Sequence, residues 1–131
     1  MPHIKGESGI EWFYDMEGEG EILIFIHGWG VDRRIWRQQF KYFSQNYKVM
    51  SFDLPGHGQS SWQKVSLEVM ARDLDTIFDQ LGFDQITLIG SSIGGMLGLR
   101  IYEFSPVSRT GRVFLSAYRF AAGPMGYRFL V

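Results

Sequence analysis

Short apolar runs alternate with amphipathic stretches along most of this chain. Ile22–Ile26 is apolar throughout, which is typical of a strand buried on both faces in a parallel sheet. Residues 33–44 and 66–81 instead carry apolar side chains at helical spacing, with Asp32 and Ser66 placed to cap the two helices. The same patterns predict strands at 10–16, 48–52, 85–89 and 113–117 and a further helix at 93–104.

The alternation of strands and helices predicts an α/β fold with a doubly wound, mostly parallel sheet. Right-handed crossovers place the strand-to-helix loops at one edge of such a sheet. That edge would carry residues 27–30, residues 53–60 and the turn around Ser92. Residues 10–16, which precede the turn-like stretch 17–20, are expected to be an early strand of a hairpin. No repeat or linker divides the 131 residues, so one domain is expected.

The composition is that of an ordinary globular protein, and it argues against several function classes. A net charge of −1 gives no reason to expect nucleic acid or a membrane as a partner. The absence of cysteine excludes disulfides and thiolate metal sites. Residues 1–8 lack the apolar core of a signal peptide, and no apolar run is long enough to span a bilayer. A cytoplasmic location is therefore the expectation.

A serine lies at the apex of a predicted strand–turn–helix. Gly90, Ser92 and Gly94 form the pattern Gly-x-Ser-x-Gly. A serine held clear of a sheet at a strained turn needs small neighbours, because its backbone is forced into an unfavourable conformation and other segments pass close by. The N-terminus of the following helix would favour negative charge at the same place. The alternative is that Ser92 only caps the helix.

Three motifs occur in order along the chain, at residues 27–30 (HGWG), 53–58 (DLPGHG) and 90–95 (GSSIGG). In this order they resemble the N-terminal half of the α/β-hydrolase superfamily. Residues from about 10 to 117 fit this pattern, and residues 118–131 form an atypical tail. Within the superfamily, the tryptophan after the His-Gly pair is similar to that of the pimeloyl-acyl-carrier-protein methyl ester esterases.

The resemblance implies that Ser92 is a nucleophile that attacks an ester carbonyl and forms an acyl-enzyme. It implies an oxyanion hole made of the backbone N–H groups of Trp29 and Ile93, with the Trp29 indole as a wall of the acyl pocket. His27 would support the oxyanion loop rather than act as the base. Structural support would also come from Gly28, Gly30, Gly90 and Gly94. Such a site takes a small-molecule ester and water, and needs no cofactor and no metal.

Other polar residues have simpler interpretations. His57 is expected to serve a glycine-flanked turn, His3 to lie in a disordered terminus, and Ser91 to be structural. Three acids, Asp73, Asp75 and Asp79, are expected to lie on a solvated helix face and not to form a metal site.

The sequence departs from the family after the nucleophile. Family members place the triad acid and histidine later in the chain, but no histidine or aspartate follows Ser92, and the only later acid is Glu103. We therefore expect the front half of an esterase, incomplete at its C-terminal side and with little or no turnover alone. Residues 113–117 would form an exposed sheet edge that favours self-association.

Two alternatives remain open from the sequence. The chain could be a non-catalytic fragment that acts as a binding or assembly partner. It could also derive from a carbon–carbon bond hydrolase or a perhydrolase of the same fold, which would use the same serine turn. The identity of the substrate does not follow from these residues.

Overall fold

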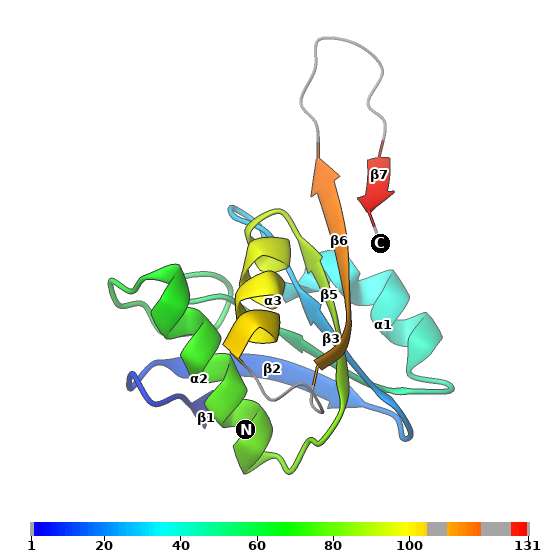
Figure 1. Ribbon diagram of the computed structural model, residues 1–131, viewed down its shortest axis with the longest axis horizontal. Helices are drawn as coiled ribbons and strands as arrows, with labels where there is room; N and C mark the ends of the chain where they lie inside the picture. The colour runs from blue at the N-terminus through cyan, green and yellow to red at the C-terminus, as the bar shows by residue number, and fades with distance from the viewer. Residues whose placement is uncertain (1, 105–109, 119–126, 131) are drawn as a thin grey trace, which may run out of the picture.

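The fold is organised around one sheet with helices on both faces (Figure 1). The computed structural model describes residues 2–104, 110–118 and 127–130, and the statements below concern these residues. The strands are β1 (His3–Lys5), β2 (Glu11–Glu17), β3 (Ile22–Ile26), β4 (Lys48–Phe52), β5 (Ile86–Ser91), β6 (Thr110–Tyr118) and β7 (Tyr127–Leu130). The helices are η1 (a 3-10 turn, Arg33–Trp36), α1 (Arg37–Phe43), α2 (Leu67–Gln80) and α3 (Ile93–Phe104).

The strands lie in the order β1-β2-β4-β3-β5-β6-β7. β4, β3, β5 and β6 run parallel to one another. The outer strands pair antiparallel, β1 with β2, β2 with β4, and β7 with β6. The predicted α/β class with a mostly parallel sheet is therefore confirmed.

The central strand β3 is buried on both faces. Ile24 and Ile26 pack in the cluster that includes residues of α2 and α3. Leu23 and Phe25 point the other way and pack with Trp36 of η1. Figure 1 shows the same division, with α2 and α3 in front of the sheet and α1 behind it. Double burial explains why the sequence of β3 has no polar alternation.

The register brings three loops to one edge of the sheet. Ile26, the last residue of β3, lies beside Phe52 of β4 on one side and Gly90 of β5 on the other. The segments that begin at His27 and Asp53 and the turn at Ser92 therefore leave the sheet together. This is the arrangement that right-handed crossovers predict.

Both predicted helix caps are present. The Asp32 carboxylate accepts from the backbone N–H of Arg34 at 2.9 Å, and the Ser66 hydroxyl accepts from that of Val69 at 3.2 Å. Hydrogen bonding from the Arg34 side chain also lowers the pKa of Asp32 to about 2. The helix predicted at 33–44 is divided into η1 and α1. After α2, Gly82 has a φ of 73°, a conformation that glycine adopts after helix ends.

β2 is an early strand of a hairpin, as predicted: it pairs antiparallel with β1, and its other neighbour is β4 rather than β3. Two other predictions need correction. The prediction of a disordered terminus at His3 is wrong, because His3 belongs to β1 and its Nε2 lies 3.2 Å from the Gln59 carbonyl oxygen. The prediction of an exposed sheet edge at residues 113–117 is wrong for residues 115–117, since β6 pairs with β7 along Leu115–Tyr118. Hydrophobic periodicity reports burial and does not identify the partner of a strand.

Asp73 of α2 is buried, which corrects its assignment to a solvated helix face. Only 1% of the surface of this residue is exposed. The carboxylate accepts from the Ser8 backbone N–H at 2.9 Å, from the Ser8 hydroxyl, and from the Trp12 indole N–H at 3.0 Å. A Cβ at Gly6 would collide with this carboxylate. Asp73 therefore anchors the turn between β1 and β2 on α2, and its donors make burial of the charge tolerable.

None of the helices in the described part of the chain is long and apolar enough to cross a membrane.

Replacing the Asp73 carboxylate by an amide should destabilise the fold. In Asp73→Asn, an NH2 group would face the Ser8 and Trp12 donors, so we expect the free energy of unfolding to fall by about 2 kcal/mol. Urea unfolding followed by circular dichroism measures this change. The matched control is Asp84→Asn, at an exposed position, which should stay within about 0.5 kcal/mol of the parent. Equal effects of the two substitutions would contradict the anchoring role.

Candidate active site

Ser92 makes the turn between β5, which ends at Ser91, and α3, which begins at Ile93. Its φ is 55°, and within the described residues no other non-glycine residue has a positive φ. Such a conformation costs on the order of 1–3 kcal/mol and persists only where the surroundings impose it. The Ser92 side chain is exposed. The turn therefore presents the hydroxyl at the sheet edge where β3, β4 and β5 end.

Glycines allow α3 to begin directly against the strand ends. A Cβ on Gly90 would collide with the backbone of Gly94 and Gly95. A Cβ on Gly94 would collide with the carbonyl oxygens of Ile26 and His27. The Gly-x-Ser-x-Gly spacing is thus a steric requirement of this turn, because any side chain at its outer positions would push α3 away from β3 and β5.

Two backbone N–H groups near Ser92 have no acceptor among the described residues. One is the N–H of Ile93, the first residue of α3: the first bonds of the helix run from Gly95 and Met96 to the Ser92 carbonyl oxygen, at 2.9 Å and 3.2 Å, and none begins at Ile93. Gly28 lies against the turn, because a Cβ there would be 3.1 Å from the Ser92 Cβ. Trp29, the next residue, has the second unused N–H. Together with the N-terminus of α3, these groups favour negative charge beside the serine.

His27 is fully buried, and both of its ring nitrogens are engaged. Nε2 accepts from the N–H of Leu54 at 2.8 Å, so Nδ1 carries the proton and donates to the Gly28 carbonyl oxygen at 2.6 Å. Burial lowers the pKa of His27, since the imidazolium would lose its hydration, and His57 adds to the effect. His27 is therefore a neutral group with no nitrogen left to take a proton from Ser92.

Asp53 orders the two loops beside the serine turn. Its buried carboxylate accepts from the backbone N–H groups of Arg33 and Gln59, each at 2.8 Å, and pairs with the Arg33 guanidinium at 2.7 Å. Arg33 pairs in addition with Asp15 at 2.6 Å and lies over the Phe13 ring, 4.2 Å from its centroid. From the sequence, Asp53 is recognised only as part of a loop motif, and nothing indicates the role of Arg33. The sequence feature that could have identified Asp53 is a carboxylate placed directly after a buried strand.

Two tryptophan side chains border this edge of the sheet. Trp29 is 73% exposed and meets the His57 ring edge-on, with centroids 4.8 Å apart. Trp62 is 70% exposed, and its indole lies against Gly56. The indole of Trp29 is therefore at the site but is not enclosed by the described residues, and its role as a pocket wall stays a prediction.

Glu103 does not lie at the serine turn. It is near the other end of α3, about 15 Å along the helix axis from Ile93. Its carboxylate pairs with Arg100 at 3.2 Å. The structure therefore brings Gly28, the residue before Trp29, against Ser92 at the start of α3, and it leaves the only acid after Ser92 elsewhere.

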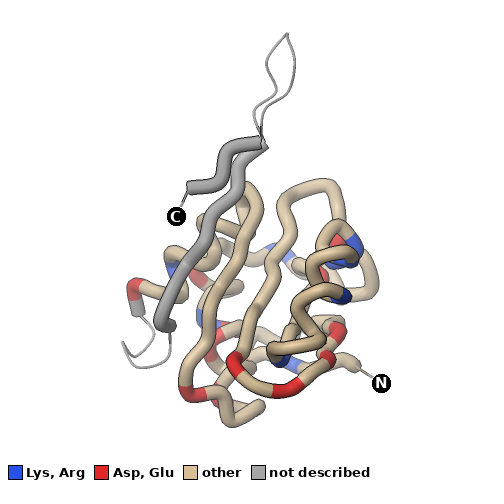
Figure 2. The backbone as a smooth tube through the Cα atoms, turned by 90° about the vertical axis from the view of Figure 1, so that its right-hand side faces the viewer, with Lys and Arg blue, Asp and Glu red and all other residues tan. Residues whose placement is uncertain are grey.

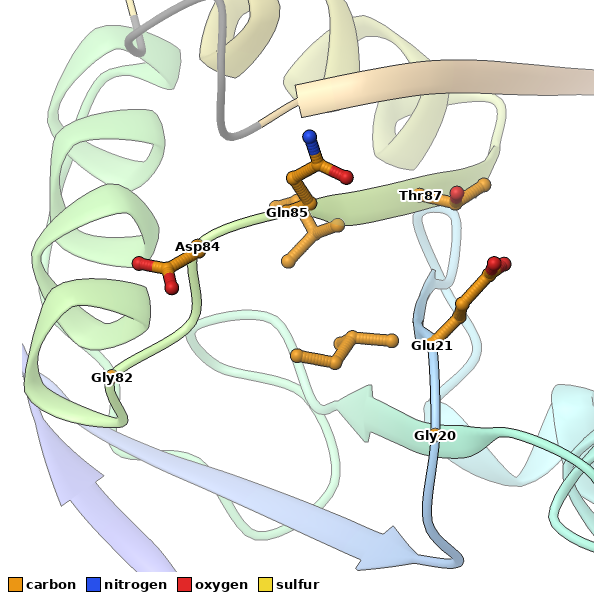
Figure 3. A pocket seen from close by; sticks show the side chains of 8 residues that line it. Gly20, Glu21, Gly82, Asp84, Gln85 and Thr87 are labelled. Atoms are coloured by element: carbon orange, nitrogen blue, oxygen red, sulfur yellow. The ribbon is translucent and has the colours of Figure 1, made fainter.

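A separate cavity of about 410 Å³ lies at the opposite end of the sheet (Figure 3). Its walls come from the starts of β3 and β5 and from the residues just before them. They are Gly20, Glu21, Ile22, Gly82, Asp84, Gln85, Ile86 and Thr87. Acidic positions gather at this end of the molecule (Figure 2), but no group of described side chains could hold a metal ion. Since Ser92 follows the last residue of β5, this cavity is not part of the serine site.

Comparison with known proteins identifies the type of fold. The model of the alpha/beta hydrolase fold family matches residues 21–119. The chain is 33% identical over 98 residues to the non-heme chloroperoxidase CPO-A1 of Kitasatospora aureofaciens, covering 72% of this chain and 36% of the relative. It is 31% identical over 97 residues to the pimeloyl-[acyl-carrier protein] methyl ester esterase of Aliivibrio fischeri, covering 72% of this chain and 35% of the relative.

A solved structure supports the same assignment. The esterase of Thermogutta terrifontis superposes with a TM-score of 0.81 at 27% identity, over 88% of this chain and 45% of that one. The chain thus spans about a third of the length of these curated relatives and just under half of the solved esterase.

The neutral state of His27 predicts a pH dependence of stability. Because folding lowers its pKa from 6.5, the unfolded chain binds more protons than the folded one below that pH. The stabilisation that results is fully present above the pKa of His27 in the unfolded chain. It is lost as the pH falls towards the lowered pKa in the folded chain, by at most about 1.4 kcal/mol per pH unit. Urea unfolding between about pH 8 and pH 5 tests it. His27→Gln should reduce the slope, because it removes the titrating group; an unchanged slope in His27→Gln would contradict the assignment.

Proposed function

Because this chain belongs to the alpha/beta hydrolase fold family, we propose that it supplies the nucleophile and the oxyanion hole for hydrolysis of a small carboxylic ester. The observation that carries the proposal is the turn at Ser92. A serine in a left-handed backbone conformation, with its side chain exposed, lies beside N–H groups that no described residue uses. A residue that only capped α3 would need neither the strained backbone nor the glycines around it.

The proposed reaction begins with attack of Ser92 Oγ on the ester carbonyl carbon, while the Ser92 proton passes to a base in solution, such as imidazole. The new C–O bond moves an electron pair onto the carbonyl oxygen, where the N–H groups of Trp29 and Ile93 donate to it. One such donor lowers the barrier by roughly 3–4 kcal/mol. Collapse of the tetrahedral intermediate expels the alcohol, which takes up a proton, and leaves an acyl group on Ser92. Water then hydrolyses this acyl-enzyme.

The proton of Ser92 requires a base that these residues do not supply. The two ring nitrogens of His27 are engaged by Leu54 and Gly28. No histidine or aspartate follows Ser92 in the chain. The hydroxyl therefore stays protonated near neutral pH, and the chain alone should be acylated slowly, with little turnover.

The relatives support ester chemistry without identifying the substrate. One curated relative is named as a methyl ester esterase, and the superposed structure is that of an esterase. Another relative is named as a chloroperoxidase, so the fold alone does not determine the reaction. A carbon–carbon bond hydrolase or perhydrolase would use the same turn, but no contact in the structure favours it over an esterase.

An activated ester with an added base tests the proposal. We expect p-nitrophenyl acetate to acetylate Ser92 faster than the exposed Ser61, by about 100-fold in the presence of imidazole, because only Ser92 has an oxyanion hole. Mass spectrometry of the two peptides measures the rates. Ser91→Ala, which removes a neighbouring buried hydroxyl, should leave the rate at Ser92 unchanged. Acetylation of Ser92 no faster than that of Ser61 would refute the proposal.

The second candidate is a non-catalytic assembly partner. It is favoured by a stripe on α3, where Met96, Leu99 and Tyr102 are 57%, 43% and 52% exposed at three-residue spacing. Exposed apolar patches of this kind are typical of contact surfaces. Elution of the chain as a monomer in size-exclusion chromatography would count against this candidate.

A further inference from the structure

Two consecutive peptide groups around Trp29 are each held by one imidazole. The peptide that joins Gly28 to Trp29 is held through its carbonyl oxygen, which accepts from His27 Nδ1 at 2.6 Å. The peptide that joins Trp29 to Gly30 is held through its N–H, which donates to His57 Nε2 at 3.1 Å. Both peptides are trans, so the N–H of Trp29 points opposite to the oxygen that His27 holds.

The two histidines connect the loops reciprocally. His27 belongs to the loop after β3 and accepts from Leu54 in the loop after β4. His57 belongs to the loop after β4 and accepts from Gly30 in the loop after β3. The rings are neighbours, with centroids 5.2 Å apart. Gly30 has a φ of 84°, so the second peptide is held in an orientation that a glycine permits.

His57 can accept from Gly30 in only one protonation state. Its Nδ1 lies 3.1 Å from the Pro55 carbonyl oxygen, so Nδ1 carries the proton and Nε2 presents its lone pair to Gly30. An imidazolium would turn an N–H towards the N–H of Gly30, and this hydrogen bond would be lost. The indole of Trp29, edge-on to the His57 ring at 4.8 Å, would lose the same support.

We propose that His57 is a positioning residue for the oxyanion loop: its neutral, Nδ1-protonated ring fixes the Trp29–Gly30 peptide, and protonation of the ring releases it. The proposal rests on the proposed function in one respect, that the adjacent N–H of Trp29 is an oxyanion donor. The hydrogen bond between Gly30 and His57 is independent of that function and can be tested by itself.

The charged groups of the two loops that surround His57 are paired with one another. Asp53 is paired with Arg33 at 2.7 Å, and Asp32 is paired with Arg34 at 2.7 Å. The ring that faces His57 directly is the buried, neutral His27. The start of α3 and the end of β5 contribute no charged side chain there, since residues 86–99 contain none.

NMR of the 15N-labelled chain between about pH 8 and pH 5 tests the hydrogen bond directly. We expect the backbone amide of Gly30 and the indole N–H of Trp29 to shift together with protonation of the His57 ring. In His57→Gln, the side-chain oxygen can accept from Gly30 but does not titrate, so both shifts should lose the change that accompanies protonation of the His57 ring. His57→Phe keeps an aromatic edge against Trp29 without an acceptor, and hydrogen exchange of the Gly30 amide should accelerate roughly tenfold.

Acetylation of Ser92 tests the positioning role. With imidazole as base, His57→Phe should slow acetylation roughly tenfold, and His57→Gln should restore most of the rate. A Gly30 amide shift that does not follow His57 protonation, or one that has the same pH dependence in His57→Gln as in the parent, would overturn the hydrogen-bond switch. Equal acetylation in the parent and His57→Phe would overturn the positioning role. Failure of the parent itself to be acetylated would instead refute the proposed function. The NMR result would still decide whether His57 holds the Gly30 N–H. If His57→Phe does not fold, His57→Gln alone provides that test.

Discussion

The close approach of α3 to the ends of β3 and β5 is the constraint on which the rest of the site depends. The backbone of Gly94 lies against the carbonyl oxygens of Ile26 and His27, with no room for a side chain between them. This contact forces the chain to turn within one residue, and Ser92 takes the left-handed conformation that results. It also brings the N-terminus of α3 beside the loop that carries Trp29. A strained serine beside the N-terminus of α3 is thus a consequence of one packing requirement.

Buried polar groups then hold the surrounding loops in register with that turn. Asp53 holds the start of η1 and the loop after β4 through Arg33 and Gln59, and His27 links Gly28 to Leu54. Each buried group is either neutral or matched by an opposite charge, as burial in an apolar surrounding requires. Loops cannot be ordered at this edge by hydrophobic packing alone, because their backbone groups need partners.

The sequence predicted the elements better than their partners. The bounds of β3, β4 and α3 follow from apolar runs, a strand-to-helix turn and helical spacing, which are local properties of the chain. The pairing of β2 with β4, the strands β1 and β7, and the burial of Asp73 depend on contacts between distant segments. At the site, the glycines around Ser92 could be interpreted because their spacing is itself a steric requirement. The role of His57 could not, since it follows from which nitrogen of the ring meets Gly30.

A crystal structure of the chain after reaction with a small alkyl fluorophosphonate tests most directly whether the approach of α3 builds an oxyanion hole. The account predicts a phosphorus bonded to Ser92 Oγ, with the phosphoryl oxygen about 2.7–3.1 Å from the backbone nitrogens of both Trp29 and Ile93. Phosphorus on another residue, or a phosphoryl oxygen turned into solvent away from both N–H groups, would contradict it.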